Sequence, residues 1–176
     1  MPRTWDAGVV DEAHLRAIAV RAVDAARGGG VIHFEGDLGA GKTTFVRALL
    51  GALGIGERVK SPTYSLIESY RVGSFEAHHL DLYRIADAGE LEWLGLGDLW
   101  TSSALVLIEW PERGRGALPA PDIRVILSHA GSERRLRMES ATARGDRLLA
   151  SFRAHADDGQ ERGAATRTDD PPTARS

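Results

Sequence analysis

Eight consecutive residues in the first third of the chain carry the clearest chemical signal. Residues 36–43 read Gly-Asp-Leu-Gly-Ala-Gly-Lys-Thr and match the pattern G-x-x-x-x-G-K-[ST] at every fixed position. The glycines allow the backbone to curl so that successive N–H groups point into one concavity, and a following helix adds the positive end of its dipole. Lys42 offers a positive charge to phosphate oxygens, and the Thr43 hydroxyl is a ligand for Mg²⁺. The motif therefore predicts a nucleotide-phosphate site.

The surroundings of the motif distinguish it from a glycine-rich turn with an incidental lysine. Such a turn would match the pattern by chance on the order of once in a couple of hundred chains of this size. Here the motif follows a short β-rich run, Val31–Phe34, and precedes a helical pattern from Lys42 to Leu53. A strand, a glycine loop and a helix are the expected context of a phosphate loop. We therefore favour nucleotide binding and expect Lys42→Ala to abolish binding or hydrolysis.

Acidic residues end two further predicted strands. Glu109 directly follows the apolar run Ala104–Ile108, and Asp81 lies at the end of the run Phe75–Leu82. The carboxyl ends of strands in an open α/β sheet converge on the ligand crevice, and Mg²⁺ prefers carboxylate oxygens. We expect Glu109 to hold the metal, and Asp81 to hold a metal-bound water or to orient the attacking one. The alternatives are a surface glutamate at a strand end and an aspartate that caps the following segment.

A hydroxyl-bearing connection follows the helix of the phosphate loop. Ser61-Pro62-Thr63 lies where many nucleotide hydrolases carry a hydroxyl that senses the γ-phosphate and its metal, which makes Thr63 a candidate catalytic residue. The same three residues are also typical of a simple turn. Farther along, the adjacent His78 and His79 point to opposite faces of a strand and make a poor chelating pair.

Two missing features narrow the reaction class. The sequence has no Asn-Lys-x-Asp, the motif that reads guanine, so adenine nucleotides are favoured. The sequence places no arginine as a finger on the γ-phosphate, and Arg84 is the nearest candidate. Intrinsic hydrolysis is therefore expected to be slow, with a partner completing the site.

The remaining pattern predicts an α/β fold of the P-loop NTPase type, with a mostly parallel sheet flanked by helices and some antiparallel strands. Further helices and strands are expected over Glu12–Arg27, Tyr64–Tyr70, Glu90–Trp100, Ile123–Leu127, Arg135–Glu139 and Asp146–Arg153. Asp11 is the candidate N-cap of the first of these helices. The alternating run Arg135–Glu139 is expected at an edge of the sheet.

Composition excludes several classes of protein. Of the 176 residues, 43% are apolar and 27% charged, and the net charge of −3 excludes a strongly basic nucleic-acid coat. Since there is no cysteine, disulfides, cysteine zinc sites and thiol catalysis are excluded. No apolar run approaches the ~20 residues of a membrane span, and the first residues lack a secretory signal, so we expect a cytoplasmic protein.

The end of the chain differs from the rest. Residues 155–176 contain no Leu, Ile, Val, Met or aromatic residue and are expected to form a disordered tail, which leaves one domain over residues 1–154. Without the five acidic and three basic residues of this tail, the domain is nearly neutral. We therefore expect the small basic patch of Arg134, Arg135 and Arg137 to be a solvated edge rather than a direct contact with nucleic acid.

Four blocks of the sequence, in this order and spacing, resemble the bacterial tRNA threonylcarbamoyladenosine biosynthesis ATPase family TsaE, also called YjeE. The blocks are residues 36–44, Val59–Tyr64 (Val-Lys-Ser-Pro-Thr-Tyr), His79–Arg84 (His-Leu-Asp-Leu-Tyr-Arg) and Glu109–Glu112 (Glu-Trp-Pro-Glu). The first block is shared by many NTPases, whereas the other three together are specific to this family. The resemblance covers residues 10–150, and Leu80 stands where the family often has Phe.

The resemblance implies a small P-loop ATPase that binds ATP or ADP with Mg²⁺. In the family, the residues matching Lys42 and Thr43 bind phosphate and Mg²⁺, and the residue matching Glu109 belongs to the metal site. The residues matching Thr63 and Asp81 act like switch elements, and the tryptophan of the last block lies near the nucleotide. Nucleotide contacts are expected from Asp37, Leu38, Gly39, Ala40, Gly41, Lys42, Thr43, Thr44 and Trp110.

The resemblance also implies a role in tRNA modification, with the TsaD and TsaB proteins as partners. Together with TsaC-type enzymes, this machinery makes N6-threonylcarbamoyl on adenosine 37 of tRNAs that read ANN codons. ATP hydrolysis by the TsaE subunit is implied to support repeated turnover of TsaD–TsaB, and tRNA is reached only through that complex.

Two other functions would use the same loop. A small-molecule kinase needs an arginine-bearing lid over its acceptor, but Asp87–Ser103, the only segment long enough, contains no Arg or Lys. A nucleotide-dependent switch with negligible hydrolysis shares every residue named above, so this alternative stays open.

Overall fold

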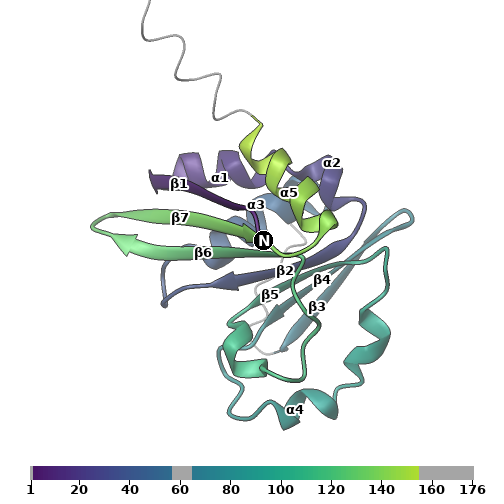
Figure 1. The fold of residues 1–176 in the computed structure, drawn as a ribbon. Helices are drawn as coiled ribbons and strands as arrows, with labels where there is room; N and C mark the ends of the chain where they lie inside the picture. Colours follow the sequence, from purple (N-terminus) through teal and green to yellow (C-terminus); the bar gives the residue numbers. More distant parts are fainter. Residues whose placement is uncertain (1, 57–64, 155–176) are drawn as a thin grey trace, which may run out of the picture.

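The residues that the structure describes, 2–56 and 65–154 of a computed structural model, form one seven-stranded mixed sheet (Figure 1). The strands are β1 (Thr4–Val10), β2 (Gly30–Glu35), β3 (Ile67–Val72), β4 (Phe75–Asp81), β5 (Leu105–Glu109), β6 (Ile123–Ala130) and β7 (Glu133–Ser140). They lie in the order β1-β7-β6-β2-β5-β4-β3. The four strands β6, β2, β5 and β4 are parallel, and the outer strands pair antiparallel with their neighbours. This confirms the predicted α/β fold.

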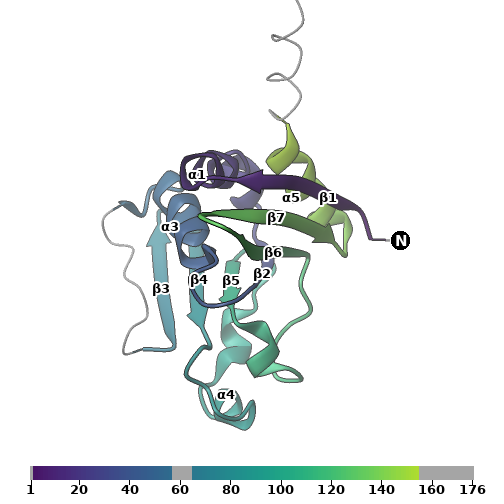
Figure 2. The same cartoon turned by 90° about the vertical axis from the view of Figure 1, so that its left-hand side faces the viewer.

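Helices cover both faces of the sheet (Figure 2). One face carries α1 (Glu12–Val20), α2 (Val23–Ala26), α3 (Lys42–Ala52) and α5 (Ala143–Arg153), and the other carries α4 (Gly89–Glu92) and the 3₁₀ helix η2 (Leu96–Leu99). A further 3₁₀ helix, η3 (Pro111–Gly114), follows β5. All five residues of β5 are buried between these layers. Leu105 and Leu107 face the larger core, whereas Val106 and Ile108 face the smaller one beneath α4.

The parallel strands end together, and this positions the functional residues. In the register of the sheet, Glu109 at the end of β5 lies opposite Phe34 of β2 and opposite Asp81 of β4. The segments that follow β2, β4 and β5 therefore begin at one edge of the sheet. This is expected, because the carboxyl ends of parallel strands meet at the same edge.

The first predicted helix is shorter than expected. It begins as predicted at Asp11, whose carboxylate accepts a hydrogen bond from the backbone N–H of His14 at 2.7 Å. It ends at Val20, and the chain resumes separately as α2. The N–H of Arg21 donates to the carbonyl of Ile18, three residues back, so the last turn tightens and the helix stops.

The continuous helix expected over Glu90–Trp100 is wrong. The segment α4 ends at Glu92, and Gly95 takes φ 63° before η2 begins. A left-handed residue cannot continue an α-helix, so the chain turns at this position. The apolar spacing does not reveal the interruption because Leu91 and Leu96 both still reach the smaller core.

The strand β1 is missing from the sequence prediction and changes one edge of the sheet. It pairs antiparallel along β7, so Arg135–Glu139 lies inside the sheet and its expected edge position is wrong. A register shift between Asp6 and Gly8 disturbs the alternation that would have marked this strand. At the opposite edge, β3 starts at Ile67, later than expected.

Two predicted segments lie outside the described residues. These are the Ser61-Pro62-Thr63 connection and the tail over residues 155–176, which both stay predictions. Within the described ranges, no helix has the length and apolar character needed to span a bilayer.

Candidate nucleotide-binding site

The phosphate-loop motif forms the connection between β2 and α3. Gly36, Gly39 and Gly41 have φ values of 146°, 77° and 107°, which residues with side chains rarely adopt. Gly36 is also required sterically, since a Cβ there would lie against the carbonyl oxygen of Leu127 on β6. Gly41 is the N-cap of α3 and makes no side-chain capping hydrogen bond. The first N–H groups of this helix are therefore open to an anion.

Lys42 turns back over the loop that precedes it. Its Nζ donates hydrogen bonds to the carbonyl oxygens of Gly36 and Asp37, the latter at 2.9 Å. The same Nζ lies 3.9 Å from the centre of the Trp110 ring. The side chain is buried, and burial lowers the pKa of Lys42, while Glu109 and other nearby carboxylates oppose that shift. The ammonium group is thus held by neutral groups that a phosphate can replace.

Glu109 links three elements through one carboxylate. The Thr43 hydroxyl donates to it, at 2.8 and 3.0 Å from its two oxygens, and His79 Nε2 lies 2.8 Å from Oε1. Glu109 is 2% exposed and His79 is fully buried. A hydroxyl and a carboxylate placed side by side are oxygen ligands of the kind that Mg²⁺ takes.

Asp81 brings a second carboxylate from the neighbouring strand. It lies opposite Glu109 in the register of β4 on β5, and it accepts a hydrogen bond from the N–H of Tyr83 at 3.1 Å. Burial raises the pKa of Asp81, and the charge of Glu109 raises it further. Both carboxylates, together with Lys42 and Thr43, line a hollow of about 200 Å³.

The charge around this hollow fits a nucleotide that brings its own cation. Four carboxylates lie close enough to Lys42 to raise its pKa, so negative charges outnumber the positive charge of Lys42 around the hollow. They belong to Asp37, Asp81, Glu109 and Glu112. Within the described ranges, no three His, Asp or Glu side chains form a cluster that could hold a metal unaided. Magnesium usually takes one or two protein carboxylates and completes its coordination with phosphate oxygens and water. The side chains therefore fit a Mg²⁺ ion that comes with a nucleotide, and Thr43 and Glu109 are the residues that would hold it.

Comparison with known proteins identifies the family. The family model described as "Threonylcarbamoyl adenosine biosynthesis protein TsaE" matches residues 9–137 of this chain. The chain belongs to the TsaE family. TsaE family proteins take part in tRNA threonylcarbamoyladenosine biosynthesis. The matched range includes the phosphate loop, β4, β5 and the start of β7.

Individual TsaE relatives cover most of this chain. The "tRNA threonylcarbamoyladenosine biosynthesis protein TsaE" of Haemophilus influenzae is 40% identical over 122 residues, which cover 69% of this chain and 77% of that protein. The Bacillus subtilis protein of the same name is 36% identical over 126 residues, covering 72% and 78%. The crystal structure of Bacillus subtilis YdiB superposes with a TM-score of 0.72 at 27% identity, covering 89% of this chain and 98% of that one.

The predicted site residues of this TsaE family member gather in one place. The hollow is lined by Leu38, Gly39, Gly41, Lys42, Thr43, Thr44, Asp81, Glu109 and Trp110, with Tyr83 and Arg134. Asp37 and Ala40 belong to the same loop, and Thr63 lies outside the described residues. The juxtaposition agrees with the sequence analysis, and the functional roles of these residues stay predictions.

Two residues reach the site that the sequence analysis did not assign to it. The His79 side chain contacts Glu109. The sequence contains a sign of this position, because residues 79 and 81 lie on the same face of a strand and Asp81 is already a site candidate. Arg134 lines the hollow from β7, whereas Arg84, the arginine expected nearest the phosphates, is exposed and does not line it. No local pattern places Arg134, because its position depends on how the β6–β7 hairpin folds onto the loop.

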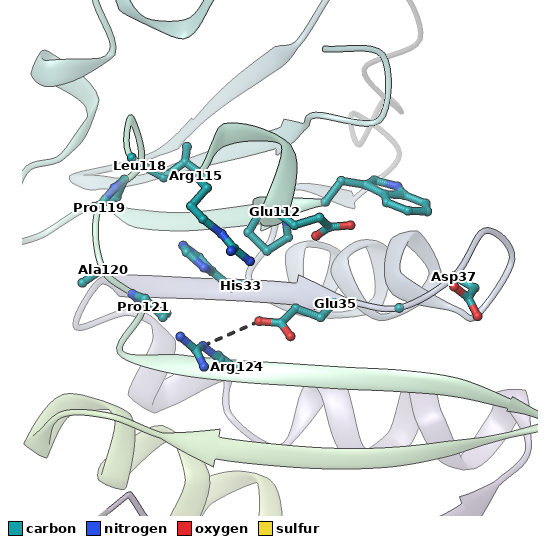
Figure 3. A pocket seen from close by; sticks show the side chains of 14 residues that line it. His33, Glu35, Asp37, Glu112, Arg115, Leu118, Pro119, Ala120, Pro121 and Arg124 are labelled. Atoms are coloured by element: carbon teal, nitrogen blue, oxygen red, sulfur yellow. Dashed lines mark ion pairs between the residues drawn. The ribbon is translucent and has the colours of Figure 1, made fainter. Parts of the chain in front are cut away.

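Trp110 also borders a second and larger hollow of about 530 Å³ (Figure 3). Figure 3 shows Glu35 of β2 and Arg124 of β6 paired there. Arg124 Nε lies 3.6 Å from Glu35 Oε1. His33 lies in the wall, and its Nε2 has no hydrogen-bond partner among the described residues. Burial lowers the pKa of His33 to about 4, so this histidine is neutral at physiological pH.

Proposed function

We propose that this TsaE family member binds ATP with Mg²⁺ and hydrolyses it in support of tRNA threonylcarbamoylation. In this proposal it acts in the cytoplasm with TsaD and TsaB and sustains their turnover on adenosine 37 of tRNAs that read ANN codons. In this proposal the chain does not bind tRNA directly and acts on it only through the complex with TsaD and TsaB. The observation that supports the proposal most directly is the contact between Thr43 and Glu109, 2.8 Å apart, beside the phosphate loop that carries Lys42.

Each of these side chains has a defined task in the proposal. The loop N–H groups and Lys42 bind the phosphate oxygens of ATP. Thr43 and Glu109 would hold Mg²⁺, which when bound would supply positive charge against the charge that develops on the phosphate oxygens. Asp81, at the end of the neighbouring strand, orients the attacking water or a water on the metal.

We propose that hydrolysis by the chain alone is weak. Two groups that the reaction needs are engaged within the chain, Lys42 with loop carbonyl oxygens and Thr43 with Glu109. Lys42 and Thr43 would have to leave these contacts to bind phosphate and Mg²⁺, and a partner that favours the released arrangement would raise the rate. TsaD together with TsaB is the partner that we propose for this role.

Phosphate release from ATP with Mg²⁺ tests the proposal, measured for the chain alone and with the TsaD–TsaB pair of the same organism. We expect the pair to stimulate release, and both Lys42→Ala and Glu109→Ala to lose the stimulated rate. Arg16→Ala, on the exposed side of α1, is the matched control and should keep it.

Two results would contradict parts of the proposal. Turnover that the pair does not change would remove the role with TsaD–TsaB and direct the search to small-molecule phosphate acceptors. Nucleotide binding without turnover under either condition would leave a nucleotide-dependent switch in place of an ATPase.

A further inference from the structure

The β6–β7 hairpin lies along the whole phosphate loop. A Cβ at Gly36 would lie 2.2 Å from the carbonyl oxygen of Leu127, and His129 Nε2 lies 3.0 Å from the carbonyl oxygen of Leu38. The tip of the hairpin is at the end of the sheet where β2 runs into the loop (Figure 1). The start of β7 is thereby brought over the last part of the loop.

Arg134 is the cation that this hairpin brings to the loop. Its Cδ and Nε both lie 3.2 Å from the position that a Cβ would occupy on Gly41. It is half-buried and lines the same hollow as Lys42. Strand alternation explains its direction, because Leu136 and Met138 follow it on the same face of β7 and are buried in the larger core.

Among the described residues, no carboxylate pairs with the guanidinium of Arg134. Its neighbours Arg135 and Arg137 pair with Asp6 and Glu139, on the other face of the strand. The backbone of Arg134 pairs within the sheet, but its side chain forms no hydrogen bond or ion pair with residues 2–56 or 65–154. An arginine fork matches the oxygens of a phosphate group. An unneutralised arginine against a phosphate loop therefore indicates an anionic ligand.

The side of the loop on which Arg134 lies indicates which phosphates it reaches. The strands β6 and β7 lie on one side of β2, whereas β5 and β4, which carry Glu109 and Asp81, lie on the other. Glu109 and Asp81, the proposed residues for the metal and the attacking water, would face the γ-phosphate, so that end of the nucleotide would lie on the β5 side. Resting on the proposed ATP binding, we propose that Arg134 binds the α- and β-phosphates, which ATP and ADP share, and so holds the nucleotide before and after hydrolysis.

Calorimetric titrations with Mg–ATP, Mg–ADP and inorganic tripolyphosphate test this role. Arg134→Gln keeps part of the side-chain stem and removes the charge, and we expect it to weaken the binding of all three ligands at least tenfold. Arg135→Gln, on the opposite face of β7, is the matched control and should change each affinity less than about twofold. Thermal unfolding without ligand should agree between Arg134→Gln and the wild type, since the guanidinium has no partner to lose in the part of the chain that the structure describes.

Several results would overturn the role of Arg134. Weaker ATP binding with unchanged ADP binding would place Arg134 on the γ-phosphate. Weaker nucleotide binding with unchanged tripolyphosphate binding would place it on the base or ribose, and unchanged affinity for all three would remove it from the site. A wild-type chain that binds no nucleotide would overturn the proposed function as well, so the two failures are distinguishable.

Discussion

Glu109 joins β5 to α3 and β4 through its hydrogen bonds with Thr43 and His79. Glu109→Gln keeps the size of the side chain and removes its charge. We expect phosphate release to fall at least tenfold, because contacts with a charged group are the stronger ones. The free energy of unfolding should not fall, since a neutral amide relieves a buried negative charge. Phosphate release and urea unfolding of one preparation check both parts, and a parallel loss of stability would instead assign Glu109 a structural role.

His33 predicts a pH dependence of stability. Burial lowers the pKa of His33 from its ordinary value of 6.5 to about 4. As the pH falls, the unfolded chain takes up this proton first, so the stability contributed by neutral His33 is present above pH 6.5 and is lost toward pH 4. We expect about 2 kcal/mol of unfolding free energy to be lost between pH 7 and pH 5 through this residue.

Urea unfolding at the two pH values checks the contribution of His33. His33→Gln should lose this part of the pH dependence, whereas His14→Gln, at an exposed position of α1, should behave like the wild type. An unchanged pH dependence in His33→Gln would show that His33 does not contribute it.

At the scale of elements, β6 holds the phosphate loop in shape. An alanine at Gly36 would bring a Cβ to 2.2 Å from the Leu127 carbonyl oxygen, whereas at Gly39 the nearest atom would be His129 Cε1 at 3.8 Å. We expect Gly39→Ala to cost about 1–2 kcal/mol of unfolding free energy from backbone strain alone. Gly36→Ala should cost clearly more, because the backbone of β6 must move. Urea unfolding of the two variants makes the comparison, and equal losses would count against the support by β6.

The elements around the site are those that the sequence predicts best. Both α3 and β5 lie within one residue of their expected bounds, because each is an apolar pattern with clear polar or glycine limits. The strand β1 shows the opposite case, since it gains its conformation by pairing with β7, far away in the sequence. Local patterns contain no information on such pairing. They miss the interruption at Gly95 for a different reason, since Leu91 and Leu96 on either side of it both reach the smaller core.

At the scale of the whole molecule, part of the site could be predicted because parallel strands end at one edge. Glu109 and Asp81 follow different strands, and the register of β4 on β5 places them opposite each other. Arg134 could not be predicted in this way. Its approach to Gly41 depends on the folding of an antiparallel hairpin over the loop, which is a tertiary contact.

The distribution of charge predicts weak contact with RNA by the isolated protein. The net charge is −3, and Arg135 and Arg137 are neutralised by ion pairs. Since tRNA phosphates are bound by clustered free cations, we expect no saturable tRNA binding by the chain alone in the micromolar range at physiological salt. Fluorescence anisotropy with labelled tRNA, with and without TsaD–TsaB, checks this. Saturable binding by the chain alone at micromolar or lower concentrations would refute the expectation.

The pairing of β1 with β7 also has a consequence for synthesis on the ribosome. Arg3 donates its N–H to the Ser140 hydroxyl across 137 residues, and β1 adds to the sheet beside β7. Residues 4–10 leave the ribosome long before residues 133–140, so a strand made early joins the sheet only when the chain is nearly complete. The hairpin that supports the phosphate loop forms in the same late stage. A nascent chain that stops before β6 therefore carries the complete motif without the strand that holds it in shape.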